Sequence, residues 1–175
     1  MKKGTDAAVT GHTHAVAGAA AGACAALVFH APVGLLPVAI ALGTATALLP
    51  DVDEPGSTVN RHLPVLGPLL GRSLRHRTVT HSAVMLAVLL LLAPLMLPHA
   101  PMRWLLIGAA GYASHLACDL LTPAGIELFW PLRGRSCIGG FVLTGGWLEQ
   151  AVFLPGFAAA LVWAILRVVG QGRAL

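Results

Sequence analysis

Histidines and carboxylates gather in one stretch of this chain, residues 48–82, and side chains of these types can bind metal ions. Asp51, Asp53, Glu54, His76 and His81 all lie in it. The whole chain has only seven acidic residues and eight histidines, so the clustering is not a consequence of a polar composition. Mixed nitrogen and oxygen ligands suit zinc, manganese or iron better than calcium, which prefers oxygen alone. The alternative interpretation is a solvated polar loop between two buried helices.

The spacing of the candidates indicates how they could meet a metal ion. His115 and Asp119 are four residues apart, so on a helix they lie one turn apart on the same face. Such a pair can give two ligands to one metal ion or bridge two ions. Asp51 and Asp53 follow Pro50, which ends the apolar segment before them. In an extended segment residues two apart point the same way, so we predict that both carboxylates face the site.

The other histidines of the stretch lie close to the start of an apolar segment. His76 and His81 are too far apart for one helical turn, so we place them on a loop and at the following helix start. Thr80 or Ser82 is expected to cap that helix. Near the amino terminus, either His14 or its neighbour His12 supplies another candidate ligand, and His14 is the preferred one.

The composition places the chain among membrane proteins. It is 57% hydrophobic and 10% charged, against about 25% charged residues in typical soluble proteins. The basic residues are dispersed over loops, which argues against nucleic-acid binding. We predict one domain over residues 1–175, an all-α polytopic membrane bundle with about five apolar segments, some short enough to be tilted or re-entrant. These segments are residues 15–29, 32–49, 83–97, 104–121 and 151–166.

The distribution of basic residues predicts the orientation of this bundle. With five spans, eight basic residues lie on the side of the amino terminus and three on the other, so the first side is cytoplasmic. His30 and His99 then fall on the opposite face. All the candidate ligands lie at the cytoplasmic ends of the segments; they are His14, Asp51, Asp53, His76, His81, His115, Asp119 and Glu149.

Several short motifs resemble the YdjM-like family of membrane-bound metal-dependent hydrolases. They begin at Thr13 (THAVAG), Leu48 (LLPDVDEPGS), His76 (HRTVTHS), Gly111 (GYASHLACDLLTPAGIELFWP) and Trp147 (WLEQ). The resemblance covers the chain from about residue 13 to 153, and it implies that the eight candidates above are the metal ligands. The HxxxD pair and the late glutamate are also similar, more weakly, to zinc-dependent phospholipase C and related nucleases.

We therefore expect a hydrolase of the bacterial inner membrane with one to three divalent ions, preferably zinc, with manganese or iron as alternatives. Asp53 or Glu54 would accept a proton from water, and Arg77 would hold an anionic phosphate. The expected substrate is a phosphoester such as a lipid headgroup at the cytoplasmic interface, or otherwise an amide or ester of an amphiphile. A metal or proton transporter and a non-catalytic module held together by metal remain as alternatives.

Overall fold

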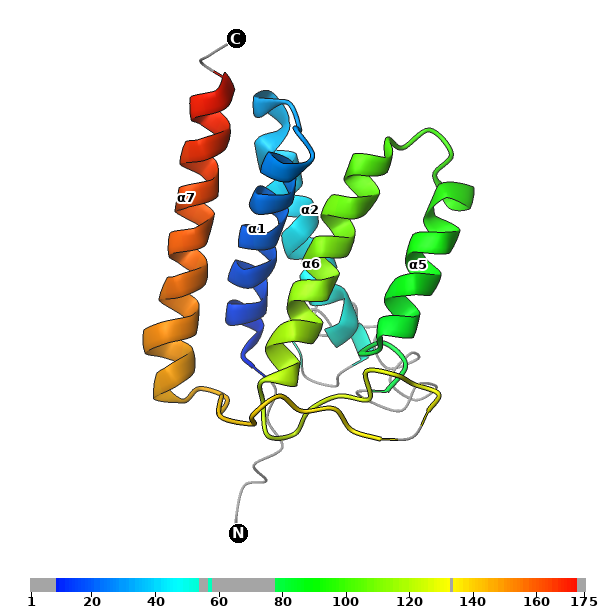
Figure 1. Cartoon of the computed structure of the whole chain (residues 1–175), viewed down its shortest axis with the longest axis vertical. Coiled ribbons are helices and arrows are strands. Elements are labelled where there is room, and N and C mark those ends of the chain that lie inside the picture. The colour runs from blue at the N-terminus through cyan, green and yellow to red at the C-terminus, as the bar shows by residue number, and fades with distance from the viewer. Residues whose placement is uncertain (1–8, 54–56, 58–77, 133, 173–175) are drawn as a thin grey trace.

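The computed structural model describes residues 9–53, 57, 78–132 and 134–172, and within these ranges the fold is all-helical. In this described part of the chain, five α-helices stand roughly side by side (Figure 1). No strand occurs among the described residues, where Ile126 and Ser136 form an isolated bridge. The helices are α1 (Gly11–Val28), α2 (Leu36–Leu48), α5 (Ala83–Met96), α6 (Met102–Leu120) and α7 (Leu154–Gly172).

Each helix coincides with one of the apolar segments predicted from the sequence, which confirms the all-α class. Short turns extend two of them: η1 (Val33–Leu35) and η2 (Leu49–Asp53) flank α2, and η3 (Glu149–Phe153) precedes α7. In the described part of the chain, two helical stretches are long and apolar enough to cross a membrane, Val33–Val52 and Glu149–Gln171.

Glycines allow α1, α2 and α6 to pack unusually closely. A Cβ atom at Gly18 or Gly22 of α1 would collide with the backbone of α2, and one at Gly111 of α6 would collide with the oxygen of Gly43 and the hydroxyl of Thr46. Gly18 and Gly22 form a GxxxG pair, which lets α2 approach α1 closely. Gly43 of α2 lies at the point where all three helices meet. The close packing there holds the three helices side by side.

The two outer helices differ in how they attach to this trio. In Figure 1, α7 stands on one side against α1, whereas α5 stands on the other side against α6. The segment between α6 and α7 runs across the lower end of the bundle, where α1, α5 and α7 begin and α2 and α6 end. Backbone hydrogen bonds hold this segment there: the Ala83 amide donates to the Leu128 carbonyl (2.8 Å), and the Ile138 amide donates to the Leu120 carbonyl (2.6 Å).

Candidate metal centre

Five buried side chains from separate parts of the chain meet at this lower end. They come from the first turn of α1, from η2, from the residue before the α5 cap, and from the last two turns of α6. All five are less than a tenth exposed, and three of them are imidazoles and two are carboxylates. We call this set the His/Asp cluster; its members are His14, Asp51, His81, His115 and Asp119.

Local structure explains how α1 and α5 deliver their histidines. Thr10 caps α1 in an extended conformation, and the first turn that follows buries His14 while leaving His12 exposed. At α5, the hydroxyl of Ser82 accepts a hydrogen bond from the Met85 amide at 3.1 Å, which confirms the predicted cap. His81 precedes this cap directly, so the start of α5 fixes its backbone position.

Asp119 lies at the middle of the cluster. Its Oδ1 is 3.3 Å from Nε2 of His14, and its Oδ2 is 3.6 Å from Nε2 of His81 and 3.5 Å from Nε2 of His115. The last distance shows that the HxxxD pair shares one helix face as the spacing predicts. Oδ1 of Asp51 completes the set at 3.7 Å from His81 and 3.8 Å from His115.

These separations fit ligands of a shared metal ion. Two ligand atoms bound to one tetrahedral zinc ion at about 2.1 Å lie roughly 3.4 Å apart. Two groups of three ligand atoms could each hold an ion, namely His14–Asp51–His115 and His81–His115–Asp119, with all atoms of a group within 4.8 Å of one another. His115 belongs to both, so the two groups are alternative positions for an ion bound to Nε2 of His115.

The state of the buried atoms also fits a cation. Nδ1 of His115 lies 2.7 Å from the carbonyl oxygen of Ala47, which can only accept, so Nδ1 carries the proton. In the neutral ring, Nε2 then presents its lone pair to the carboxylates. Both ring nitrogens of His14, Oδ1 of Asp51 and Nε2 of His115 make no hydrogen bond to the described residues. Burying such polar atoms without a partner is costly, and a cation bound to the acceptors among them would compensate part of that cost.

Glu149 lies at the start of η3, and its carboxylate contacts donors other than those of the His/Asp cluster. Its Oε1 accepts hydrogen bonds from the amide (2.8 Å) and hydroxyl (2.6 Å) of Thr10 and from the hydroxyl of Thr13 (2.7 Å). Its Oε2 accepts from the amide of Gly145 at 2.7 Å. The structure thus brings Glu149 to the N-cap and first turn of α1, and not into either group of ligand atoms. Its role as a metal ligand stays a prediction.

The segment after α2 corrects one expectation. We predicted an extended stretch with Asp51 and Asp53 pointing the same way, but residues 49–53 form the 3₁₀ turn η2. In a helix with three residues per turn, side chains two apart do not share a face, so the argument that paired these carboxylates is wrong. The side chain of Asp53 and all of Glu54, His76 and Arg77 lie outside the described residues, and their roles stay predictions.

Three supporting residues were not predicted from the sequence. Thr13 binds Glu149, Thr80 lies with its hydroxyl 3.0 Å from Nδ1 of His81, and Tyr112 donates its hydroxyl hydrogen to the carbonyl oxygen of Thr80. One signal could have revealed Tyr112: it is the single tyrosine of the chain and precedes His115 by three residues. The Thr80 hydroxyl is a partner of the kind that orients ligand imidazoles in metal sites.

Comparison with known proteins gives the family. The family model described as "YdjM inner membrane protein" matches residues 9–174. Inner membrane protein YdjM of Escherichia coli strain K12 and that of Shigella flexneri are each 37% identical over 127 residues, which is 69% of this chain and 61% of those proteins. The match therefore spans about three fifths of their length. Uncharacterized protein YvsG of Bacillus subtilis strain 168 is 32% identical over 87% of this chain and 91% of its own. No solved structure matches the chain.

Proposed function

Because this chain belongs to the YdjM family of inner membrane proteins, we propose that it is a polytopic membrane hydrolase that uses divalent metal ions to cleave a phosphoester. The observation that carries the proposal is the His/Asp cluster, in which three imidazoles and two carboxylates are buried together at one end of the bundle. A divalent ion at such a site lowers the pKa of water from 15.7 towards about 7 and polarises the bond under attack.

Individual residues of the chain would bind the metal ion, accept the proton and hold the phosphate. The cluster would hold the ion, with the bond between His115 and Ala47 fixing the ring that both groups of ligands share. Asp53 or Glu54 would take the proton of the attacking water, and the alcohol released from phosphorus would leave with a proton. Arg77, which the sequence places between His76 and His81, would bind two phosphate oxygens.

The placement of polar groups supports an enzyme over a transporter. Among the described residues, every buried polar or charged side chain belongs to the lower end of the bundle or its connecting segment. The two threonines in the middle of α2 bond to carbonyls of their own helix, Thr44 to Ile40 (2.9 Å) and Thr46 to Leu42 (2.9 Å). A transport path would need polar groups along its whole length.

A module held together by metal is the second candidate, because the cluster joins α1, η2, α6 and the start of α5. An assay of phosphoester hydrolysis distinguishes the hydrolase from the structural module. Purified protein loaded with zinc or manganese should hydrolyse synthetic phosphodiesters and phospholipids, lose that activity with a chelator, and recover it when the metal returns. Bound metal without turnover on any phosphoester would favour the structural module.

We place the centre at the cytoplasmic face, following the distribution of basic residues. In a variant without native cysteines, a cysteine at Arg135, which is exposed at the lower end, should resist impermeant thiol reagents in intact cells. A cysteine at His99, which is exposed between α5 and α6, should react. The reverse pattern would move the centre to the outer face.

A further inference from the structure

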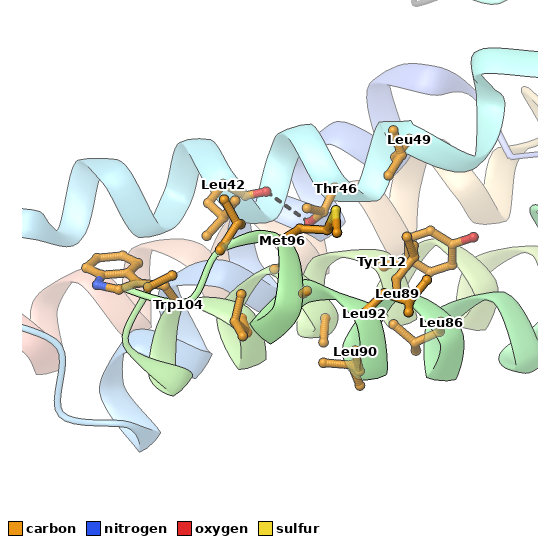
Figure 2. A pocket seen from close by; sticks show the side chains of 16 residues that line it. Leu42, Thr46, Leu49, Leu86, Leu89, Leu90, Leu92, Met96, Trp104 and Tyr112 are labelled. Atoms are coloured by element: carbon orange, nitrogen blue, oxygen red, sulfur yellow. Dashed lines mark hydrogen bonds between the residues drawn. The ribbon is translucent and has the colours of Figure 1, made fainter.

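An apolar groove lies between α2, α5 and α6 and has a volume of about 510 Å³ (Figure 2). Volumes of roughly 300–1,000 Å³ are typical of ligand pockets. The two hydroxyl groups in its wall are both engaged: Thr46 bonds to Leu42 of its own helix, and Tyr112 bonds to Thr80. The groove therefore offers carbon surface to its occupant, which favours a hydrocarbon over water or a polar solute.

The groove is open along one side. Its α5 wall includes Leu89, Leu92 and Met96, which are 38%, 44% and 74% exposed. This opening exists because α5 packs on α6 and not closely on α2. In a bundle that spans a membrane, such an opening faces the bilayer at hydrocarbon depth, so an acyl chain can enter it sideways from the lipid.

One end of the groove adjoins the His/Asp cluster. Figure 2 shows Trp104 and Leu42 at one end of the groove and Tyr112, Leu86 and Leu49 towards the other. The second end is the one that lies nearer to the cluster.

Three short links show this proximity. Tyr112 lies one helical turn before His115, and its hydroxyl bonds to Thr80, the residue before His81. Leu49 begins the same turn, η2, that carries Asp51. The proposed metal ligands therefore lie within one helical turn or a few residues of the groove's lining at this end.

We propose that the groove binds the acyl chain of a phosphoester lipid whose headgroup reaches the His/Asp cluster. This inference rests on the proposed function and narrows its substrate to amphiphiles with a hydrocarbon chain. The volume argues against a helix from a second copy of the protein. A helix about 10 Å wide occupies roughly 400 Å³ for each turn, so a groove of about 510 Å³ would enclose little more than one turn of it.

Photo-crosslinking tests the proposal with lysophosphatidic acid that carries a diazirine in its acyl chain. The full-length protein in nanodiscs is irradiated, and the labelled peptides are identified by mass spectrometry. Label should concentrate in α2, α5 and α6, and unlabelled lysophosphatidic acid should reduce it several-fold. Label on the lipid-facing side of α7, around Val162 and Leu166, should respond to no competitor.

A matched pair of variants on α5 locates the binding site. Ala93→Trp fills the groove and should reduce the competed label several-fold, whereas Ala87→Trp, on an exposed position of α5 outside the groove, should leave it unchanged. Ala109→Phe fills the groove from α6 and serves if Ala93→Trp loses helicity. Equal labelling of α7 and the groove without competition, or crosslinks between two copies through the groove, would overturn the proposal.

The test of the groove and the test of the proposed hydrolase activity can fail independently of each other. His115→Ala should keep the groove label, because the acyl chain makes no contact with the metal. Groove labelling without phosphoester hydrolysis would refute the hydrolase and leave the lipid site standing. Hydrolysis of long-chain substrates that Ala93→Trp does not slow would refute the groove and leave the hydrolase standing.

Discussion

The imidazole rings of His14 and His115 stack on each other, with centroids 3.9 Å apart and planes 19° from parallel. The first ring comes from the start of α1 and the second from near the end of α6, so two helices far apart in sequence share one contact. Both rings direct Nε2 at the same carboxylate, Asp119. Neutral imidazole is the form that binds metal ions, and this arrangement places two such donors side by side.

Replacing a ring or the shared carboxylate should remove the metal. We expect His115→Ala and Asp119→Ala each to abolish binding of zinc or manganese, because both residues supply atoms to the cluster. His99→Ala, which changes an exposed position between α5 and α6, is the control and should keep full metal content. Elemental analysis of purified protein is the measurement. Equal loss of metal in the control would refute a single centre at the lower end.

The hydrogen bond between the Thr80 hydroxyl and the His81 ring should affect metal affinity, although Thr80 contributes no ligand atom. Thr80→Val removes the hydroxyl that lies 3.0 Å from Nδ1 of His81, so affinity should fall about 10- to 100-fold. Thr44→Val removes a similar hydroxyl bond within α2, away from the cluster, and should leave affinity unchanged. Competition with a chromogenic chelator measures both. Equal effects of the two changes would mean that the Thr80 hydroxyl does not orient His81.

Close helix packing predicts different outcomes for two Gly→Ala changes. Gly111→Ala places a methyl group against the Gly43 oxygen and the Thr46 hydroxyl, so the free energy of unfolding should fall by about 1–3 kcal/mol. Gly156→Ala, on α7, meets open space and should be neutral or stabilising by up to about 1 kcal/mol. Thermal unfolding in detergent provides the comparison. A Gly111→Ala protein as stable as the Gly156→Ala protein would contradict the observed helix contact.

Glu149→Gln separates anchoring from metal binding. The amide would turn a donor towards one of the groups that now donate to the carboxylate, so we expect a loss of about 2 kcal/mol in stability. Because the cluster keeps its five members, the metal content should stay close to that of the unchanged protein. Glu127→Gln, on a partly buried carboxylate of the connecting segment, is the control for loss of charge. Metal loss as complete as in His115→Ala would establish Glu149 as a ligand.

Arg77 provides a test of the phosphoester itself. If its guanidinium binds two phosphate oxygens, Arg77→Lys should cost about 2 kcal/mol of transition-state stabilisation on an anionic substrate while metal content and melting temperature stay unchanged. Turnover, metal content and melting must be measured on the same preparation. Unchanged turnover would remove Arg77 from the mechanism, and loss of metal together with fold would give it a structural role.

The sequence alone was sufficient to predict where the helices lie and which residues form much of the cluster. Apolar runs predict where α1, α2, α5, α6 and α7 lie, because a helix in an apolar setting needs a long uncharged stretch. The HxxxD spacing predicts a shared face on α6 because helical periodicity is local. Family membership, which the motifs suggested, is confirmed by the family match.

What could not be predicted depends on contacts between distant residues. No local pattern shows that Thr10 and Thr13 surround Glu149, since these hydroxyls meet the carboxylate only after α1 and α7 pack together. Local rules also failed after Pro50, where η2 is helical and not extended. The groove was unforeseen because periodicity does not reveal that α5 stays apart from α2.

The hydrogen bond from the Thr10 amide to the Glu149 carboxylate joins residues 139 positions apart. This separation has a consequence for biogenesis. A ribosome releases the amino end first, so the five members of the cluster emerge before their anchor does. Until residue 149 is synthesised, the first turn of α1 lacks the carboxylate that receives three of its hydrogen bonds. The chain thereby has an intrinsic order of assembly, in which the first turn of α1 gains its carboxylate partner only after the other members of the bundle up to α6 have been synthesised.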